Sequence, residues 1–331
     1  MVWRDISDPR KAEWMDDLEA DLREPEYENI MMPEKFGPVS EIIDDHKIKR
    51  YAFEINDYME WAMREGTNPF GKERIAHATL LTNDIVQLFT LGFKGSKVIG
   101  LHTLAELTFK APARINEVVT LQGEYTEKFV KRGQGMVVLE ADVKGEDGRT
   151  IVEYRGEEIM RTIPGEIAGR GTAEVTSERK VTGEIPENAR VISKIDKETR
   201  IGDVFGPLEK EITAEQAAVF SRVGEFVINI HNNLEKAHEG NLRIPIVQGA
   251  QLYCTIGQLL SDVCGAELFT DGWLKAKFIA PVKVFEGFKV YGMVSSIEQL
   301  ENGKKKYLMD VWIRRDSDQR LAVVGWASCV K

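Results

Sequence analysis

Two nine-residue stretches of this chain resemble each other, and this repeat limits the folds that the chain can adopt. Residues 109–117 read FKAPARINE, and residues 278–286 read FIAPVKVFE. Phe109 pairs with Phe278 at an offset of 169, and the same offset places Gly123 on Gly292. Matching residue types at one constant offset indicate an internal duplication, so we expect two structurally similar halves in tandem.

Alternating apolar and polar residues surround both copies and predict antiparallel strands. A GEDG sequence at residues 145–148 supplies the turn that a hairpin needs. A further short strand is expected at residues 189–193. The main strands are expected at residues 101–112, 117–129, 135–145 and 149–161, and again at 274–282, 288–298, 305–315 and 321–330.

Helical patterns precede the strands in each half. The first half predicts helices at residues 53–66 and 76–91, and the second predicts an amphipathic helix at 212–223. An apolar helix follows from Gly249 to Cys264, and a helix that is apolar on nearly every side is normally buried. The fold class is therefore α+β, with polar loop residues placed directly before a buried helix.

The offset between the halves is not constant before the strands. Trp61 pairs with Phe220 at an offset of 159, and Ile75 pairs with Ile246 at an offset of 171. We therefore expect a longer loop between the two helices of the second half. The predicted organisation is an N-terminal arm (1–50), a first half (51–161), a connector (162–203) and a second half (204–331).

The composition excludes several classes of protein. A net charge of −10 argues against non-specific binding to nucleic acid or to anionic membranes. The three cysteines form no CxxC pair, and no His, Asp or Glu cluster has metal-ligand spacing, so we expect no metal and no cofactor. The chain lacks a signal peptide and a membrane-spanning run, which predicts a cytoplasmic protein.

Short motifs recur in the same order in both halves. The first half contains Gly66-Thr67-Asn68-Pro69, Ile75-Ala76-His77-Ala78 and Phe109-Lys110-Ala111-Pro112. The second half contains Gly224-Glu225, Asn229-Ile230-His231, Ile246-Val247-Gln248-Gly249 and Phe278-Ile279-Ala280-Pro281. In this order the motifs resemble those of the MaoC-like, R-specific enoyl-CoA hydratases and dehydratases. The resemblance covers about residues 50–160 and 200–331.

The resemblance implies a double hotdog fold, in which two tandem helix-plus-antiparallel-sheet repeats form a pseudo-dimer. It also implies a lyase that adds or removes water across the 2,3-double bond of an enoyl-CoA thioester. This chain departs from the family pattern at Glu225, which stands for an aspartate one residue too far from His231, and at Gln248, which replaces a histidine. The first half has Gly66 where the acid is expected and no histidine after Pro69, so we expect it to be catalytically empty.

The chemistry of water addition assigns roles to these residues. His231 and Glu225 are the candidates for gripping and deprotonating water, with Asn229 orienting it. Gly249, together with Gln248, is the candidate for binding the thioester oxygen at a helix N-terminus. The cations that follow the two prolines, Arg114 and Lys283, are the candidates for binding CoA phosphates.

Each assignment has a structural alternative. Glu225 can cap the next helix, Asn229 can be an ordinary turn residue, and Gly249 can simply allow close packing. His77 is expected to make hydrogen bonds at a helix end, and His46, His102 and His238 are interpreted as surface or structural residues.

Two other functions remain open on the sequence. A hotdog acyl-CoA thioesterase uses the same scaffold, and a non-catalytic acyl-CoA-binding or assembly subunit agrees with the imperfect motifs. In each case the partner is an acyl-CoA thioester. Since the two halves mimic a dimer, a monomer, a homodimer and a hetero-oligomer all agree with the sequence.

Overall fold

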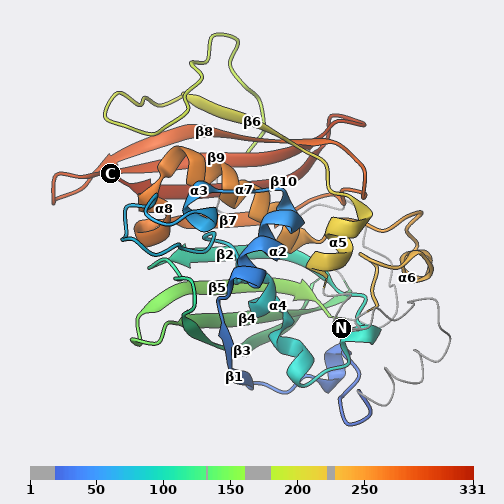
Figure 1. Cartoon of the computed structure of the whole chain (residues 1–331). Coiled ribbons are helices and arrows are strands. Elements are labelled where there is room, and N and C mark those ends of the chain that lie inside the picture. Colours follow the sequence, from blue (N-terminus) through green and yellow to red (C-terminus); the bar gives the residue numbers. More distant parts are fainter. Residues whose placement is uncertain (1–18, 132, 161–179, 222–227) are drawn as a thin grey trace.

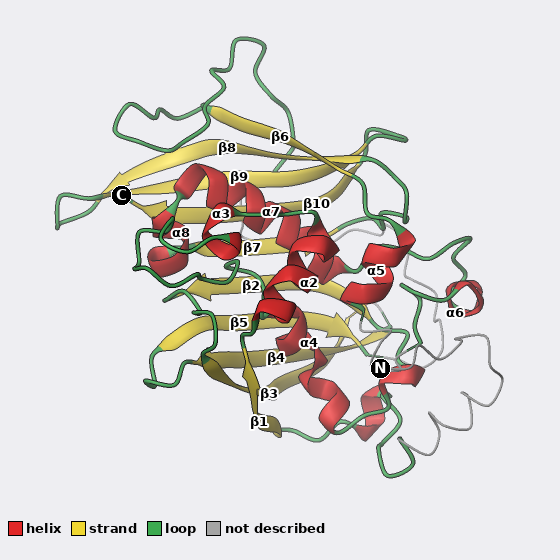
Figure 2. Ribbon diagram, viewed as in Figure 1, coloured by secondary structure: helices red, strands yellow, loops and turns green. Residues whose placement is uncertain are grey.

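The computed structural model describes residues 19–131, 133–160, 180–221 and 228–331, and its described strands form one ten-stranded antiparallel sheet. Figures 1 and 2 show the helices lying across one face of this sheet. The strands are β1 (Glu34–Ile42), β2 (Leu101–Phe109), β3 (Val118–Lys131), β4 (Gln134–Lys144), β5 (Thr150–Ile159), β6 (Val204–Lys210), β7 (Trp273–Phe278), β8 (Phe288–Gln299), β9 (Lys305–Arg315) and β10 (Leu321–Val330). The α-helices are α2 (Asp45–Ile55), α3 (Glu60–Met63), α4 (Thr82–Val86), α5 (Ala214–Phe220), α6 (Leu234–Glu239), α7 (Gly249–Cys264) and α8 (Ala266–Asp271), and the 3₁₀ turns are η1 (Tyr27–Asn29), η2 (Gln87–Leu91) and η3 (Gly95–Lys97).

The strands of the second half follow those of the first in the sheet, in the reverse spatial order. The sheet runs β1-β3-β4-β5-β2 and continues as β7-β10-β9-β8-β6, so the halves meet where β2 pairs with β7. Leu104 pairs there with Lys277, and Thr108 pairs with Trp273. The offset of 169 carries Leu104 onto Trp273 and Thr108 onto Lys277, so the two pairs exchange. The two halves are therefore related by a pseudo-two-fold axis between β2 and β7.

The edge strands show that the duplication extends further toward the N-terminus than the sequence pattern predicted. β1 contains Phe36-Gly37-Pro38 and β6 contains Phe205-Gly206-Pro207, again at an offset of 169. Both glycines have a positive φ, 87° and 86°, and a Cβ on either would lie within 2.8 Å of a carbonyl oxygen of the neighbouring strand. Residues 34–42, expected in an N-terminal arm, are thus the edge strand that pairs with β3.

The first helices differ from the predicted ones. Residues 53–66 do not form one helix, because α2 ends at Ile55 and Asn56 adopts a left-handed conformation with φ of 52°. α3 then begins at Glu60. α2 is equivalent to α5 at the constant offset, since their N-caps are Asp44 and Thr213. The prediction that pairs Trp61 with Phe220 is therefore wrong, and Tyr51 occupies the corresponding position.

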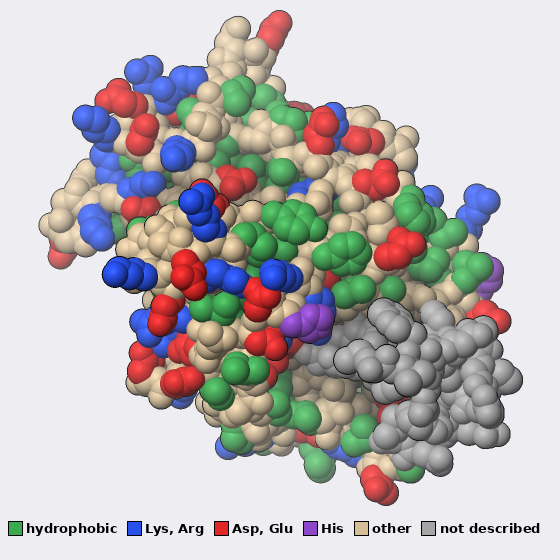
Figure 3. All heavy atoms as spheres, in the orientation of Figure 1, with side chains coloured by type: hydrophobic (Ala, Val, Ile, Leu, Met, Phe, Trp, Pro, Cys, Tyr) green, Lys and Arg blue, Asp and Glu red, His purple; other side chains and the backbone are tan. Residues whose placement is uncertain are grey.

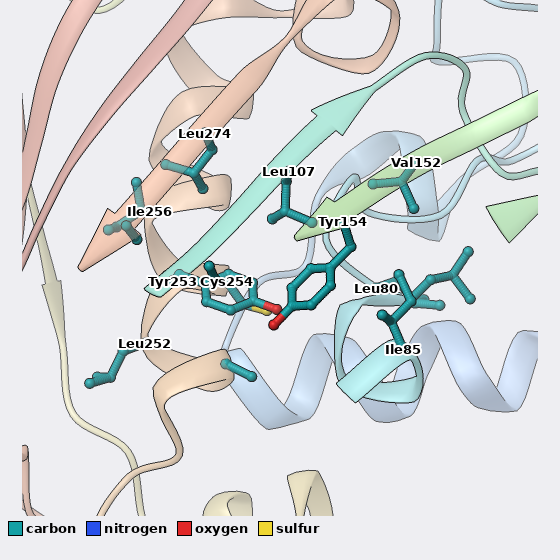
Figure 4. Close-up of a cluster of buried hydrophobic side chains, with 14 of the residues drawn as sticks. Leu80, Ile85, Leu107, Val152, Tyr154, Leu252, Tyr253, Cys254, Ile256 and Leu274 are labelled. Carbon is teal, nitrogen blue, oxygen red and sulfur yellow. The ribbon is translucent and has the colours of Figure 1, made fainter. Parts of the chain in front are cut away.

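The central helices of the two halves also differ from each other. Only residues 82–91 of the predicted helix 76–91 are helical, as α4 followed by the 3₁₀ turn η2. The second copy, α7, is a 16-residue helix that is buried along most of its length, as predicted. Figure 4 shows Ile256 of α7 near Leu274 of β7, and Leu107 of β2 belongs to the same cluster of buried residues. One hydrophobic core is therefore shared by both halves.

The eight main predicted strands are confirmed, whereas residues 189–193 form only an isolated bridge between Val191 and Val204. β2 and β7 stop at Phe109 and Phe278, shortly before each Ala-Pro pair, because proline cannot donate to a ladder. In the part of the chain that the structure describes, no helix is long and apolar enough to cross a bilayer. Over the face seen in Figure 3, Lys and Arg side chains lie among Asp and Glu side chains.

Candidate active site

The loop before α6 holds His231 in a defined turn. The Asn229 side-chain oxygen accepts a hydrogen bond from the His231 backbone N–H at 2.9 Å, and the Asn232 side chain accepts one from the Asn229 N–H at 2.9 Å. Asn233 then caps α6. The side-chain oxygen of Asn229 is therefore engaged in a turn that positions His231, which matches the turn-residue alternative.

The ring of His231 has a determined tautomer. Its Nδ1 donates to the carbonyl oxygen of Ile246 at 2.8 Å, and because a carbonyl only accepts, Nδ1 carries the proton. Nε2 is then the basic nitrogen, and none of the described residues makes a hydrogen bond to it. Burial lowers the pKa of His231 to about 4, so the ring is neutral at neutral pH. A neutral imidazole with a free Nε2 can act as a general base.

Two residues of the first half form a buried pair, and one of them, His102, lies near His231. His102 of β2 and Glu158 of β5 are opposite each other in the sheet, and His102 Nε2 lies 3.3 Å from Glu158 Oε1. The same nitrogen lies 2.6 Å from the hydroxyl of Tyr154. Burial, and to a smaller extent the charge of a protonated His231, lowers the pKa of His102 to about 4. Burial also raises the pKa of Glu158 to about 7.

The N-terminus of α7 closes this cluster. A Cβ on Gly249 would lie 3.3 Å from both His102 Cβ and the Phe278 ring, so the glycine lets the helix approach β2 closely. The side chain of Gln248 donates to Asn83 at 3.3 Å, and Asn83 donates to the Phe220 carbonyl. The first N–H groups of a helix have no intrahelical acceptor, so they are free to bind an oxygen atom that develops negative charge.

The structure brings together some of the predicted residues and separates others. The ring of His231 is bonded to Ile246, which precedes Gln248 and Gly249 by two and three residues. Lys283 forms a bridge with the same Ile246 and is exposed. Arg114 lies at the equivalent point of the first half, bridged to Ile75, and so is apart from this cluster. Glu225 lies outside the described residues, so its role stays a prediction.

His102, Glu158 and Asn83 were not identified as site residues from the sequence. They belong to three separate elements of the first half, so no spacing along the chain links them to His231. The strand alternation predicts that Glu158 and Tyr154 share one face of β5, since they are four residues apart. The pairing of β5 with β2, which places His102 opposite Glu158, is not encoded in that pattern.

The first half contains a second pair of an acid and a histidine, although it was expected to lack the acid. His77 occupies the position equivalent to Gln248, and its Nε2 lies 2.9 Å from the Asp57 carbonyl oxygen and 3.7 Å from the Asp57 carboxylate. Burial lowers the pKa of His77 to about 4 and raises the pKa of Asp57 to about 6. His77 makes a hydrogen bond as expected, but not at the start of a helix, because α4 begins only at Thr82 and the partner is the carbonyl of Asp57 after α2.

Three surface cavities, of about 610, 400 and 500 Å³, lie away from His231. The first is a groove over β3, β4 and β5 with several carboxylates, the second lies between Trp61 and the end of α7, and the third surrounds Arg114. None of these three is lined by His231, Gln248 or Glu158. The candidate site therefore rests on the side-chain cluster rather than on an open cavity.

Comparisons with known proteins identify the fold. A scan against protein-family models finds no match, and a search of curated proteins finds none either. A solved MaoC-like dehydratase superposes with a TM-score of 0.68 at 13% identity, covering 94% of this chain and 99% of the other. A MaoC-like dehydratase from Phytophthora capsici gives a TM-score of 0.56 at 14% identity, covering 90% of this chain and 96% of the other.

A conserved hypothetical protein from Mycobacterium tuberculosis, described as having a double hotdog fold, gives a TM-score of 0.60 at 13% identity. That match covers 93% of this chain and 99% of the other. Identities this low establish the fold alone. The pseudo-symmetric ten-stranded sheet and these superpositions together show that the chain has the double hotdog fold of the MaoC-like dehydratases.

Proposed function

We propose that the protein is a hydratase or dehydratase that adds or removes water across the 2,3-double bond of an enoyl-CoA thioester. One observation carries the proposal. The neutral ring of His231 is bonded to Ile246 just before the N-terminus of α7, and its basic Nε2 has no hydrogen-bond partner among the described residues. The shared fold with MaoC-like dehydratases supports the reaction class, and the geometry supports the residue roles.

The residues have distinct roles in this reaction. His231 takes a proton from water as the oxygen attacks the β-carbon, and this kind of assistance typically contributes about 10²–10⁴-fold to the rate. The N–H of Gly249, at the positive end of α7, binds the thioester oxygen as negative charge develops there, with the amide of Gln248 beside it. The cation proposed to bind a CoA phosphate is Lys283, and its exposure and its bridge to Ile246 support this role.

Two readouts on one substrate panel test this proposal. The protein is incubated with straight-chain, branched and aromatic enoyl-CoA thioesters, and loss of the enoyl absorbance and release of free thiol are followed separately. We expect loss of absorbance without thiol release, and we expect His231→Ala to abolish it while the circular dichroism spectrum is unchanged. Thiol release alone would indicate a thioesterase, and neither signal across the panel would indicate a binding or assembly role.

A further inference from the structure

We infer that the first half completes the active site of the second: His102 delivers a proton to the substrate, and Glu158 stores that proton and positions His102. The inference rests on the proposed hydration reaction and adds the acid that the reaction needs. It also replaces the expectation that the first half is catalytically empty. The first half would supply the acid, and the second half would supply the base.

The first support is the contact between the two residues. His102 and Glu158 face each other across β2 and β5, and their side chains are only 8% and 11% exposed. Glu158 Oε1 lies 3.3 Å from His102 Nε2 but has no hydrogen-bond partner among the described residues. The hydroxyl of Tyr154, 2.6 Å from the same nitrogen, holds the imidazole in place. A small rotation of the carboxyl group would therefore complete a hydrogen bond to His102.

The second support is the position of His102 at the site. Gly249 is in contact with His102, which places the imidazole-bearing residue against the N-terminus of α7. Ile99, three residues before His102, packs with Ile230 and Ile246 in one small buried cluster. Ile230 precedes His231, and Ile246 accepts the hydrogen bond from its ring. The segments that carry the two histidines, one from each half, are thus anchored in the same small apolar cluster.

The third support is the charge environment of Glu158. The titratable groups that face it are His102 on β2, Tyr125 on β3, Tyr154 on β5 and Tyr253 on α7, and within the described ranges no Lys or Arg side chain pairs with it. In Figure 4 the hydroxyl ends of Tyr154 and Tyr253 point toward one another. Without a cation to stabilise the carboxylate, burial favours the protonated form of the acid.

The fold itself does not require an acid at this position. β10 is the counterpart of β5, and its corresponding end carries Ser328 and Cys329, which are uncharged and buried. A buried carboxyl group without a full set of hydrogen bonds lowers stability, because its desolvation is not compensated. The acid at Glu158 is therefore specific to the site that contains His231, which is what a role in proton transfer would require.

The proposed step balances atoms and charges. In hydration, His231 Nε2 accepts a proton from water as the water oxygen bonds to the β-carbon. The electron pair of the double bond moves toward the thioester oxygen through the α-carbon. The α-carbon then forms a C–H bond with a ring proton of His102, while His102 receives the proton of Glu158. Transfer of the proton from His231 back to Glu158 through His102 restores the starting state.

Four variants test the inference. Glu158→Gln should lower kcat for hydration about 10²-fold with KM changed less than about twofold, because proton supply is lost and binding is not. Glu158→Asp should restore part of the rate, and His102→Gln should match Glu158→Gln. The control is Glu153→Gln, an exposed residue on the same strand that pairs with Lys110, and it should behave as wild type.

The pH profile separates proton storage from a structural role. Wild-type kcat for hydration should fall as the pH rises above about 7, because Glu158 loses its proton there. This alkaline limb should disappear in Glu158→Gln. Infrared spectra of the wild type should show a protonated-carboxyl band below that pH which is missing in the variant. This measurement does not depend on turnover, and Glu158→Asp replaces Glu158→Gln if the latter does not fold.

Each outcome decides the matter. A wild type that hydrates enoyl-CoA, with Glu158→Gln retaining both kcat and the alkaline limb, would overturn the inference and leave the proposed function intact. A wild type without hydration on any substrate would overturn the proposed function and the inference with it. Loss of rate in Glu158→Gln with no recovery in Glu158→Asp, and with an unchanged pH profile, would show that Glu158 only supports the fold.

Discussion

The turns that lead into the two central helices share a backbone frame but differ in chemistry. In the first half Ile75 bridges to Arg114, and in the second half Ile246 bridges to Lys283. The two isoleucines are related by an offset of 171, and the two cations by an offset of 169. Two residues after this isoleucine the first half has His77 and the second half has Gln248. The duplication therefore preserved the bridge to the sheet, while the equivalent polar residue changed from His77, five residues before α4, to Gln248, the N-cap of α7.

The histidines of the two halves differ in what their Nε2 atoms contact. Nε2 of His77 is 2.9 Å from the Asp57 carbonyl oxygen, and the residue is only 5% exposed. His231 instead uses Nδ1 for its bond to Ile246, so its basic nitrogen is Nε2, which has no hydrogen-bond partner among the described residues. By the same argument the basic nitrogen of His77 is Nδ1, and this atom is buried without a partner in the described part of the chain. The two rings therefore differ in exposure, because His77 is buried whereas His231 is only half-buried and can be reached by a substrate.

Replacing each histidine by glutamine should give the largest contrast between the halves. His231→Gln should lower kcat about 10²–10⁴-fold, because a general base is lost. His77→Gln should change kcat less than about threefold. It should lower the free energy of unfolding by about 1–3 kcal/mol, because the carbonyl of Asp57 loses the hydrogen bond from the imidazole. Steady-state hydration and urea unfolding measure the two effects. A large rate loss in His77→Gln would mean that the first half contains a working site of its own.

The pH dependence of stability should have opposite signs for the two buried groups His77 and Glu158. The pKa of His77 is lowered from 6.5 to about 4 in the folded state, so folding binds fewer protons and stability is lost as the pH falls through this window. When the pH is lowered from 7.5 to 5, the free energy of unfolding of His77→Gln should therefore increase by about 2 kcal/mol relative to that of the wild type. Urea unfolding at the two pH values measures this difference.

The pKa of Glu158 is raised from 4.5 to about 7, so its contribution is present at low pH and is lost as the pH rises. When the pH is raised from 5 to 7.5, the free energy of unfolding of Glu158→Gln should therefore increase by about 2 kcal/mol relative to that of the wild type. Equal pH slopes in the two variants and the wild type would contradict the burial of both groups. Glu153→Gln, with an exposed carboxylate, serves as the control.

The smallest effects are expected at the equivalent N-caps. Asp44 accepts from the Lys47 N–H at 2.7 Å, and Thr213 accepts from the Gln216 N–H at 3.2 Å. Asp44→Ala and Thr213→Ala should each cost about 1 kcal/mol in urea unfolding, with kcat changed less than about twofold. A rate loss confined to Thr213→Ala would show that α5 also helps to set the loop of His231, and would break the equivalence of the two helices.

Much of the architecture was predictable because it depends on local pattern. Alternating residues predict strands, and the constant offset between the two nine-residue stretches predicts that the strands recur in two halves. His231 and Gly249 became candidates through the resemblance of their motifs to the MaoC-like pattern, and their roles stay predictions. Helix ends were less predictable, because Asn56 ends α2 through a left-handed conformation that a helical hydrophobic pattern does not reveal.

The sequence by itself determined the duplication and the α+β class, and its motifs proposed His231 as the base of the candidate site. Tertiary structure decided which residues of the first half lie near that histidine. Along the chain His102 and Glu158 are separated by strands β3 and β4, and they meet only because β5 pairs with β2 in one register. His102 lies near enough to His231 for their charges to interact, because β2 lies where the two halves join. Strand register and the contact between halves are set by non-local packing, which the local order of residues does not specify.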